Sequence, residues 1–217
     1  MHYAIGDIHG ERGKLDRLLA RIREDAAGRA HRIVVLGDIV DKGPDSAGAV
    51  ARVRELQRGG AVVIQGNHES MAVRARKGTQ REHWLGKGGR EMLASYKGDS
   101  ARLEDDLDWM AALPTRHVTQ DRRFVFVHAG LDPDLFPAPS PVTHLWTRTE
   151  AFMQSERWTN PALEGVTVVH GHTPTSTEPD VSADGRRINV DTHASAGGPL
   201  TAAVCVPGEA VRFVDSD

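Results

Sequence analysis

Short apolar runs alternate with amphipathic stretches along the chain. Two stretches repeat their apolar residues at helical spacing, one over Leu15–Ile22 and one over Val50–Leu56. A strand, a helix and a strand in this order predict right-handed crossovers and mostly parallel pairing. Five apolar runs have the length and the flanking residues of buried strands: His2–Ile5, Ile33–Leu36, Ala61–Ile64, Phe124–Val127 and Val166–Val169.

The remaining pattern divides into a helical middle and a strand-rich end. Residues 70–113 are predicted to be largely helical and, lacking clusters of ligand-type residues apart from His83, to form a cap or flank. A strand at His117–Thr119 and a proline-rich surface loop over residues 132–144 follow. The last three strands are expected to be antiparallel: Arg187–Val190, Leu200–Val206 and Ala210–Val214.

Composition places the chain among soluble globular proteins. Its 217 residues, 39% hydrophobic and 26% charged, predict a single α/β domain over residues 1–217 that needs no disulfide. A net charge of −3 gives no electrostatic footprint for nucleic acid. The lone Cys205, with no signal peptide or transmembrane stretch, predicts a cytoplasmic protein without a membrane partner.

Each of the five predicted strands ends in a Gly-adjacent cluster of Asp, His or Asn. The clusters are Gly6–Gly10, Gly37–Asp41, Gly66–Glu69, His128–Gly130 and His170–Thr173. Any one of them is also ordinary turn or helix-cap chemistry. Ligands of α/β sheets gather outside the carboxyl ends of the strands, and these side chains are ligands for divalent metals. Five such ends together favour a metal-dependent hydrolase.

The ordered motifs resemble a known family. Gly-Asp-Ile-His-Gly, Gly-Asp-Ile-Val-Asp-Lys-Gly-Pro, Gly-Asn-His-Glu, His-Ala-Gly and Gly-His-Thr-Pro are similar to those of the phosphoprotein phosphatases among the calcineurin-like metallophosphoesterases, closest in length to small bacterial and phage-lambda-type members. The resemblance spans residues 4 to about 203 and includes Trp84–Tyr96, Leu145–Arg148 and Asn189–Ala203. It implies a two-sheet β-sandwich of mixed sheets flanked by helices, with the site at the edge loops.

The resemblance also implies two divalent metal ions. Asp7 and His9 would bind the first ion, Asp38 would bridge both, and the second would be held by Asn67, His128 and His172. A hydroxide bridging the ions would attack phosphorus directly. Manganese is carried over from bacterial relatives, although oxygen and nitrogen ligands also suit iron, zinc, cobalt and nickel.

Further roles follow from the same resemblance. His68 would be the general acid, oriented by Asp41, and Arg148, Lys42 and Asn67 would bind the phosphate. Lysine at position 42 replaces the family's usual arginine and loses its planar fork. Asp191 is interpreted as structural or as supporting the ligands, His170 as a neighbour of the site, and His193 as a surface residue in place of the usual glycine. Surface or packing roles are expected for the remaining histidines: 2, 31, 83, 117 and 144.

Three functions are compatible with these residues. The first is a phosphomonoesterase acting on phosphoserine and phosphothreonine in proteins, and the chain is expected to be a monomer. The second is a nucleotide hydrolase similar to the symmetrical diadenosine tetraphosphatases, which tend to be longer at the C-terminus and often differ at the position of Asp41. The third is a binding module without catalysis, which the complete ligand set disfavours. Asp41 and the chain's end at Asp217 favour the first.

Overall fold

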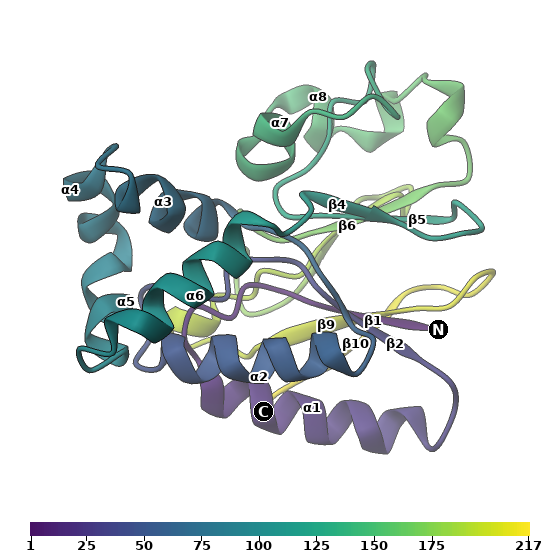
Figure 1. Cartoon of the computed structure of the whole chain (residues 1–217). Helices are drawn as coiled ribbons and strands as arrows, with labels where there is room; N and C mark the ends of the chain where they lie inside the picture. The colour runs from purple at the N-terminus through teal and green to yellow at the C-terminus, as the bar shows by residue number, and fades with distance from the viewer.

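Two five-stranded sheets pack face to face in the computed structural model, which describes residues Met1–Asp217 (Figure 1). The first sheet has the order β10-β9-β1-β2-β3 and contains β1 (His2–Ile5), β2 (Arg32–Val35), β3 (Val62–Val63), β9 (Thr201–Cys205) and β10 (Arg212–Asp215). The second has the order β4-β5-β6-β8-β7 and contains β4 (Arg116–Val118), β5 (Phe124–Val127), β6 (Thr167–His170), β7 (Asp180–Val181) and β8 (Arg187–Asn189).

Helices cover the outer faces and one side of this sandwich (Figure 1). They are α1 (Arg12–Ala26), α2 (Ser46–Arg58), α3 (Asn67–Arg76), α4 (Arg81–Trp84), α5 (Arg90–Ser95), α6 (Ser100–Ala111), α7 (Pro141–Trp146) and α8 (Glu150–Met153). Four short turns complete the chain: the π-helical η1 (Leu85–Gly89) and the 3₁₀ turns η2 (Ser155–Arg157), η3 (Pro161–Leu163) and η4 (Ala194–Ala196). None of the helices is long and apolar enough to cross a membrane.

The core lies in three layers that follow from the apolar pattern. Strand residues on the inner faces meet between the sheets, where Ala4 and Val34 of the first sheet share a cluster with Phe126 of the second. The stripe predicted on α1 packs with α2 against the outer face of the first sheet. Phe152 and Trp158 cover the outer face of the second. Each fully buried large side chain stabilises the fold by about 1.5–3 kcal/mol relative to an exposed one.

Helix boundaries are set by local chemistry. The Asp45 carboxylate caps α2 by accepting a hydrogen bond from the Gly48 N–H at 2.8 Å. The end of α1 is a left-handed residue, Ala27, whose N–H bonds back to the carbonyl of Arg23. These ends fix where each crossover returns to the sheet and therefore where the loops after the strands lie.

Strand pairing brings the predicted clusters to one edge. The strands β1 and β2 are parallel with Ile5 opposite Val35, so the segments that follow them run side by side. In the second sheet, β5 and β6 are also parallel. The carboxyl ends of β1, β2, β3, β5 and β6 therefore open toward a common region.

The predicted two-sheet α/β sandwich with mixed sheets is confirmed, with three corrections of detail. The strand predicted over Arg187–Val190 is parallel to β6 and antiparallel only to the short β7, because the chain crosses over between β6 and β8. The loop predicted over residues 132–144 ends in α7, which begins at Pro141, a residue suited to the first turn of a helix. The middle helices do more than flank the sheets, because α4 reaches the site.

Candidate metal centre

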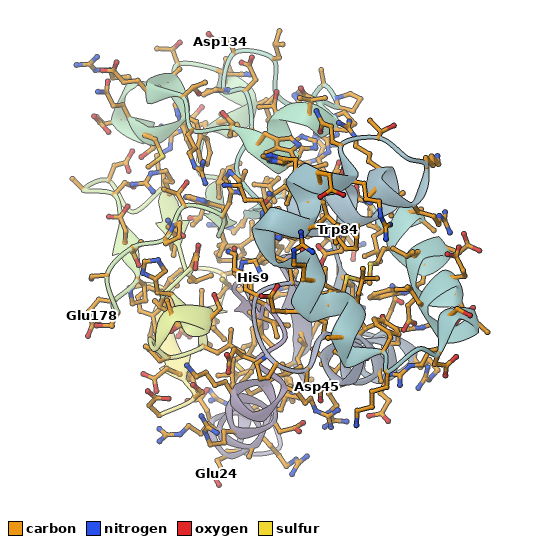
Figure 2. All side chains as sticks on the ribbon, turned by 90° about the vertical axis from the view of Figure 1, so that its left-hand side faces the viewer. His9, Glu24, Asp45, Trp84, Asp134 and Glu178 are labelled. Atoms are coloured by element: carbon orange, nitrogen blue, oxygen red, sulfur yellow. The ribbon has the colours of Figure 1, made fainter.

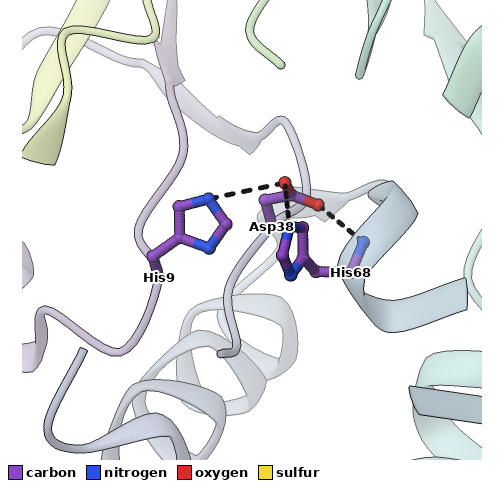
Figure 3. Close-up of side chains that lie close together, drawn as sticks. All are labelled: His9, Asp38 and His68. Carbon is purple, nitrogen blue, oxygen red and sulfur yellow. Dashed lines mark hydrogen bonds and ion pairs between the residues drawn. The ribbon is translucent and has the colours of Figure 1, made fainter. Parts of the chain in front are cut away.

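Asp38 lies at the centre of the cluster formed by the strand ends. Its Oδ2 is 3.5 Å from Nε2 of His9, and its Oδ1 is 3.4 Å from Nε2 of His128. The same Oδ1 accepts a hydrogen bond of 2.9 Å from the backbone N–H of His68 (Figure 3). With one oxygen toward each group of ligands, this carboxylate has the position that a bridging ligand needs.

The first group consists of Asp7 and His9 beside Asp38. Nε2 of His9 is 3.9 Å from Oδ2 of Asp7. The other ring nitrogen of His9, Nδ1, donates to the carbonyl of Val40 at 2.9 Å, so Nε2, on the side of the carboxylates, carries the lone pair. Asp7 in turn accepts from the backbone N–H of His172 at 3.2 Å. Backbone contacts therefore orient both ligands.

The second group consists of Asn67, His128 and His172. Oδ1 of Asn67 is 2.8 Å from Nε2 of His128 and 2.9 Å from Nδ1 of His172. Nδ1 of His128 donates to the carbonyl of Leu36 at 2.9 Å. Nε2 of His172 is buried and has no hydrogen-bond partner. An amide oxygen and two imidazoles, one with a free buried nitrogen, form a donor set suited to a divalent ion.

The buried negative charges of the site favour the binding of cations. Five carboxylates are buried around it: Asp7, Asp38, Asp41, Glu69 and Asp191. Burial raises the pKa of Asp7 and of Asp38 well above the ordinary value, and the charges of Asp191 and Glu69, respectively, add to this effect. Divalent ions bound among these groups would offset both the burial and the mutual repulsion. The residues present therefore fit the metal ions that the family implies.

The histidines of the site are held neutral, as metal ligands must be. Burial lowers the pKa of His9 to about 3, and the nearby Lys42 charge contributes. Burial also lowers the pKa of His172 to about 3, with a further contribution from Arg148. The pKa of His128 is lowered by burial and by His172.

Glu69 shapes the loop that carries Asp38. Its carboxylate is fully buried and accepts hydrogen bonds from the backbone N–H groups of Asp38, Ile39 and Val40, and from Gly66. A Cβ on Gly66 would lie 2.2 Å from Oδ1 of Asp38, so only glycine permits this approach. The Gly-Asn-His-Glu motif thus builds the loop as well as supplying Asn67.

Backbone strain is concentrated at the site. Five of its residues have left-handed φ angles without being glycine: His9 (45°), Asp38 (49°), Asp41 (71°), Lys42 (65°) and His172 (70°). Each such residue costs of order 1–3 kcal/mol and persists only where the surroundings impose it. This strain aims the ligand side chains inward from tight loops, and no periodicity in the sequence predicts it.

The proposed acid and its partner are in contact. Nδ1 of His68 lies 2.7 Å from Oδ2 of Asp41, and Nε2 of His68 lies 3.9 Å from Oδ2 of Asp38. Figure 3 shows the His68 ring beside Asp38, with His9 on the other side of that carboxylate. An imidazole whose Nδ1–H is fixed by a carboxylate presents Nε2 to the reacting groups, which suits an acid or base.

Cationic side chains border the ligands. Arg148 is exposed and contacts the loop of His172, with Nη2 3.2 Å from the His172 carbonyl and Nε 3.3 Å from Oγ1 of Thr173. Lys42 is also exposed, and its Nζ lies 2.7 Å from Nε2 of His9. Both positions suit binding of phosphate oxygens at the rim.

The other histidines and Asp191 surround the site without joining it. His193 is exposed, as expected, and its N–H donates to Asp191. His170 is buried against Phe152 and Arg187. Of the histidines expected to have surface or packing roles, His31 and His83 are exposed, His2 and His117 are half-buried, and His144 is buried.

Two residues that contact the site were not predicted from the sequence, Trp84 and Gly171. The indole N–H of Trp84 donates to both oxygens of Asp41, at 3.0 and 3.2 Å. A Cβ on Gly171 would lie 2.1 Å from Oδ1 of Asp7, so this glycine gives the carboxylate its space. The signals were present, because Trp84 begins one matching segment and Gly171 lies inside a motif.

The chain is similar to known phosphoesterases. The calcineurin-like phosphoesterase family matches residues 3–197. The chain is 30% identical to serine/threonine-protein phosphatase 1 of Salmonella typhimurium over 93% of this chain and 90% of that protein. It is 31% identical to a symmetrical bis(5'-nucleosyl)-tetraphosphatase of Janthinobacterium over 72% of this chain, but spans only 52% of that protein.

Two solved structures show the same fold. One is a protein serine/threonine phosphatase from Saccharomyces cerevisiae, 14% identical, with a TM-score of 0.64 over 99% of this chain and 78% of that chain. The other is a candidate diadenosine tetraphosphatase, 24% identical, with a TM-score of 0.64 over 99% of this chain and 92% of that chain. The chain belongs to the calcineurin-like phosphoesterase family and, within it, to the phosphoprotein phosphatases.

Proposed function

We propose that this phosphoesterase removes phosphate from phosphoserine and phosphothreonine in proteins. The observation that carries the proposal is the buried contact of 2.7 Å between His68 and Asp41 beside the ligand cluster. A serine or threonine alkoxide is a poor leaving group and needs a proton as it departs, whereas a nucleotide phosphate leaves readily without one. The similarity to the Salmonella phosphatase over nearly the whole of both chains supports the same assignment.

Different residues of the chain would bind the metal ions, orient the phosphate and protonate the leaving oxygen. Asp7, His9 and Asp38 would hold one divalent ion, and Asp38, Asn67, His128 and His172 would hold the other. When bound, the two ions supply an activated water and stabilise the charge on the phosphoryl oxygens. We propose that both ions are Mn²⁺.

Arg148 and Lys42 would orient the substrate phosphate from the rim, together with Asn67. As the bond between phosphorus and the leaving oxygen breaks, His68 would give its Nε2 proton to that oxygen. Asp41 would hold the ring in place and stabilise the protonated form of His68 before transfer. Asp41, Lys42, Asn67 and His68 follow strand ends, whereas Arg148 follows α7.

A symmetrical dinucleotide tetraphosphatase is the second candidate. Several such enzymes match the chain at about the same identity, for example 35% to that of Pseudomonas fluorescens over 60% of this chain. The chain spans about half the length of these relatives, 43% in this case. A divalent metal centre can serve hydrolysis of either substrate, so the metal site alone does not distinguish the two.

Side-by-side turnover distinguishes the two functions. Metal-stripped protein, with and without added Mn²⁺, is given a phosphoserine peptide and diadenosine tetraphosphate, and released phosphate and nucleotides are measured. Metal-dependent turnover of the peptide with little turnover of the dinucleotide supports the proposal. Preference for the dinucleotide assigns the chain to nucleotide hydrolysis.

Location and assembly are part of the proposal. We propose a monomer that acts in the cytoplasm on phosphoprotein, with no nucleic-acid or membrane partner. The single cysteine, Cys205, is buried and free, which is compatible with a reducing compartment. Sedimentation at several protein concentrations tests the monomer, and fractionation of the source cells tests the location.

A further inference from the structure

We propose that Trp84 is a positioning residue that holds the Asp41 carboxylate so that it can orient His68. This inference rests on the proposed role of His68 as the acid. The three side chains form a buried row, because Nε1 of Trp84 lies 3.0 Å from Oδ2 of Asp41, and that oxygen lies 2.7 Å from Nδ1 of His68. Trp84 is 3% exposed and Asp41 is 0% exposed, so water does not compete for these bonds.

The hydrogen bond from Trp84 limits rotation of the carboxylate. Its N–H reaches both oxygens of Asp41, at 3.0 and 3.2 Å, and thus restricts the plane of the group. Besides Trp84, only His68 bonds to the Asp41 carboxylate. The nearby Oγ of Ser46 accepts instead from the backbone N–H of Asp41, at 3.0 Å. Without the indole, His68 would be the carboxylate's one remaining partner. The carboxylate could then rotate about its Cβ–Cγ bond, and the imidazole could move with it.

A second contact joins the same helical segment to this loop. The backbone N–H of Lys42 donates to the carbonyl of Gly88, in η1, at 3.3 Å. A Cβ on Gly88 would lie 2.3 Å from the Lys42 nitrogen, and its φ of 110° also requires glycine. Asp41 and Lys42 both have left-handed φ, so this contact supports a strained pair of residues.

The indole ring of Trp84 is also held by close packing. A Cβ on Gly89 would lie 2.5 Å from the Trp84 ring, so the glycine backbone packs directly on the indole. Figure 2 labels Trp84 on the helical side of the molecule, with His9 next to that side. The segment over residues 84–89 is therefore shaped to bring one N–H donor to Asp41, which a purely structural cap would not require.

The test compares Trp84→Phe with a matched control, Trp109→Phe. Trp109 also donates an indole hydrogen bond, to Oε1 of Gln57 at 2.7 Å. It lies on α6 and has no hydrogen bond to a proposed metal ligand. Both variants are assayed on a phosphoserine peptide and on p-nitrophenyl phosphate, which has a good leaving group. Weakened acid catalysis predicts a loss of about 10- to 100-fold in kcat on the peptide for Trp84→Phe, a smaller loss on the aryl ester, and KM nearly unchanged.

Two outcomes overturn the proposal. One is an equal loss on both substrates, which indicates a general structural role. The other is a Trp84→Phe variant that behaves like Trp109→Phe. If the wild-type protein does not hydrolyse the peptide at all, the proposed protein phosphatase function fails, and the next measurement still tests the position of Trp84.

That measurement is independent of catalysis. In metal-free protein, nitrogen-edited NMR detects the Nδ1 proton of His68, identified by its absence in His68→Asn. We expect this proton to be protected from exchange with water in the wild type and in Trp109→Phe, and to exchange faster in Trp84→Phe. Unchanged exchange in a folded Trp84→Phe contradicts the proposal. Should Trp84→Phe not fold, Trp84→His, which retains a ring N–H, is compared with Trp84→Leu by the same two readouts.

Discussion

Nζ of Lys42 lies 2.7 Å from Nε2 of His9, the atom that faces the carboxylates of Asp7 and Asp38. The ammonium group thus lies within hydrogen-bond distance of a proposed metal ligand, at a position where the family usually has arginine. A lysine carries the same charge as arginine but lacks its planar pair of donors, so it holds a phosphate oxygen with less directional control.

Lys42→Arg should therefore keep or raise activity. Arginine supplies two parallel donors for the phosphate while preserving the charge. The measurement is kcat/KM on a phosphoserine peptide, with the exposed Lys87→Arg as control. A large loss in Lys42→Arg alone would show that lysine has a role specific to this chain.

His68→Asn should separate substrates by their leaving groups. Removing a general acid lowers turnover by about 10²–10⁴-fold where the leaving oxygen needs the proton, and less for an aryl phosphate. Asn67 and Asp38 remain, so binding of Mn²⁺ should be kept. The ratio of kcat values for a phosphoserine peptide and p-nitrophenyl phosphate is the measurement. Equal losses on both would argue against the acid role.

Gly171→Ala should weaken metal binding without unfolding the protein. The added Cβ would lie 2.1 Å from Oδ1 of Asp7 and must displace this carboxylate, whereas the φ of Gly171 is one that alanine tolerates. Disturbing a ligand's surroundings costs about 10–100-fold in metal affinity. Titration of metal-free protein with Mn²⁺ measures the loss.

The control for this change is Gly86→Ala. A Cβ at Gly86 meets nothing within 4 Å, so binding should be unchanged there. Equal affinity in the two variants would mean that Asp7 can move without cost or is not a ligand.

His144 should make stability fall at acid pH. Burial lowers its pKa from the ordinary 6.5 to about 4, and the charge of Arg116 adds to this. Between pH 4 and pH 6.5, His144 binds a proton in the unfolded chain but not in the folded chain. The contribution of neutral His144 to the free energy of unfolding is therefore complete above pH 6.5 and is lost as the pH falls toward 4. The Tm of the wild type should exceed that of His144→Gln by more at pH 7 than at about pH 4.5.

Other titrating groups cancel in that comparison because both proteins share them. A gap for His144→Gln that is constant or widens at acid pH would contradict the assigned shift.

The sequence was informative where local pattern determines structure. The stripe Leu15–Ile22 gave α1, and the run Phe124–Val127 gave β5 with the same bounds, because burial of an apolar face has a fixed period. The site could be located because parallel strands end at one edge of a sheet. Asp7 and Asp38 follow the paired parallel strands β1 and β2.

Features that depend on distant contacts could not be predicted. Trp84 and Asp41 are separated by 43 residues, and their hydrogen bond exists only after α4 and the loop after β2 pack together. The pairing of β8 with β6 likewise depends on the crossover and not on the strand's own residues. The left-handed φ of His9 and His172 is imposed by surrounding packing, since neither residue type requires it.

In the proposed centre two divalent ions share Asp38, and electron paramagnetic resonance of the protein titrated with Mn²⁺ tests this sharing. We expect binding of two ions per chain and the spectrum of an exchange-coupled pair. His172→Ala, which removes a ligand of one ion only, should bind less and show the spectrum of an isolated ion. Binding of a single ion by the wild type, or two ions without coupling, would contradict the shared carboxylate.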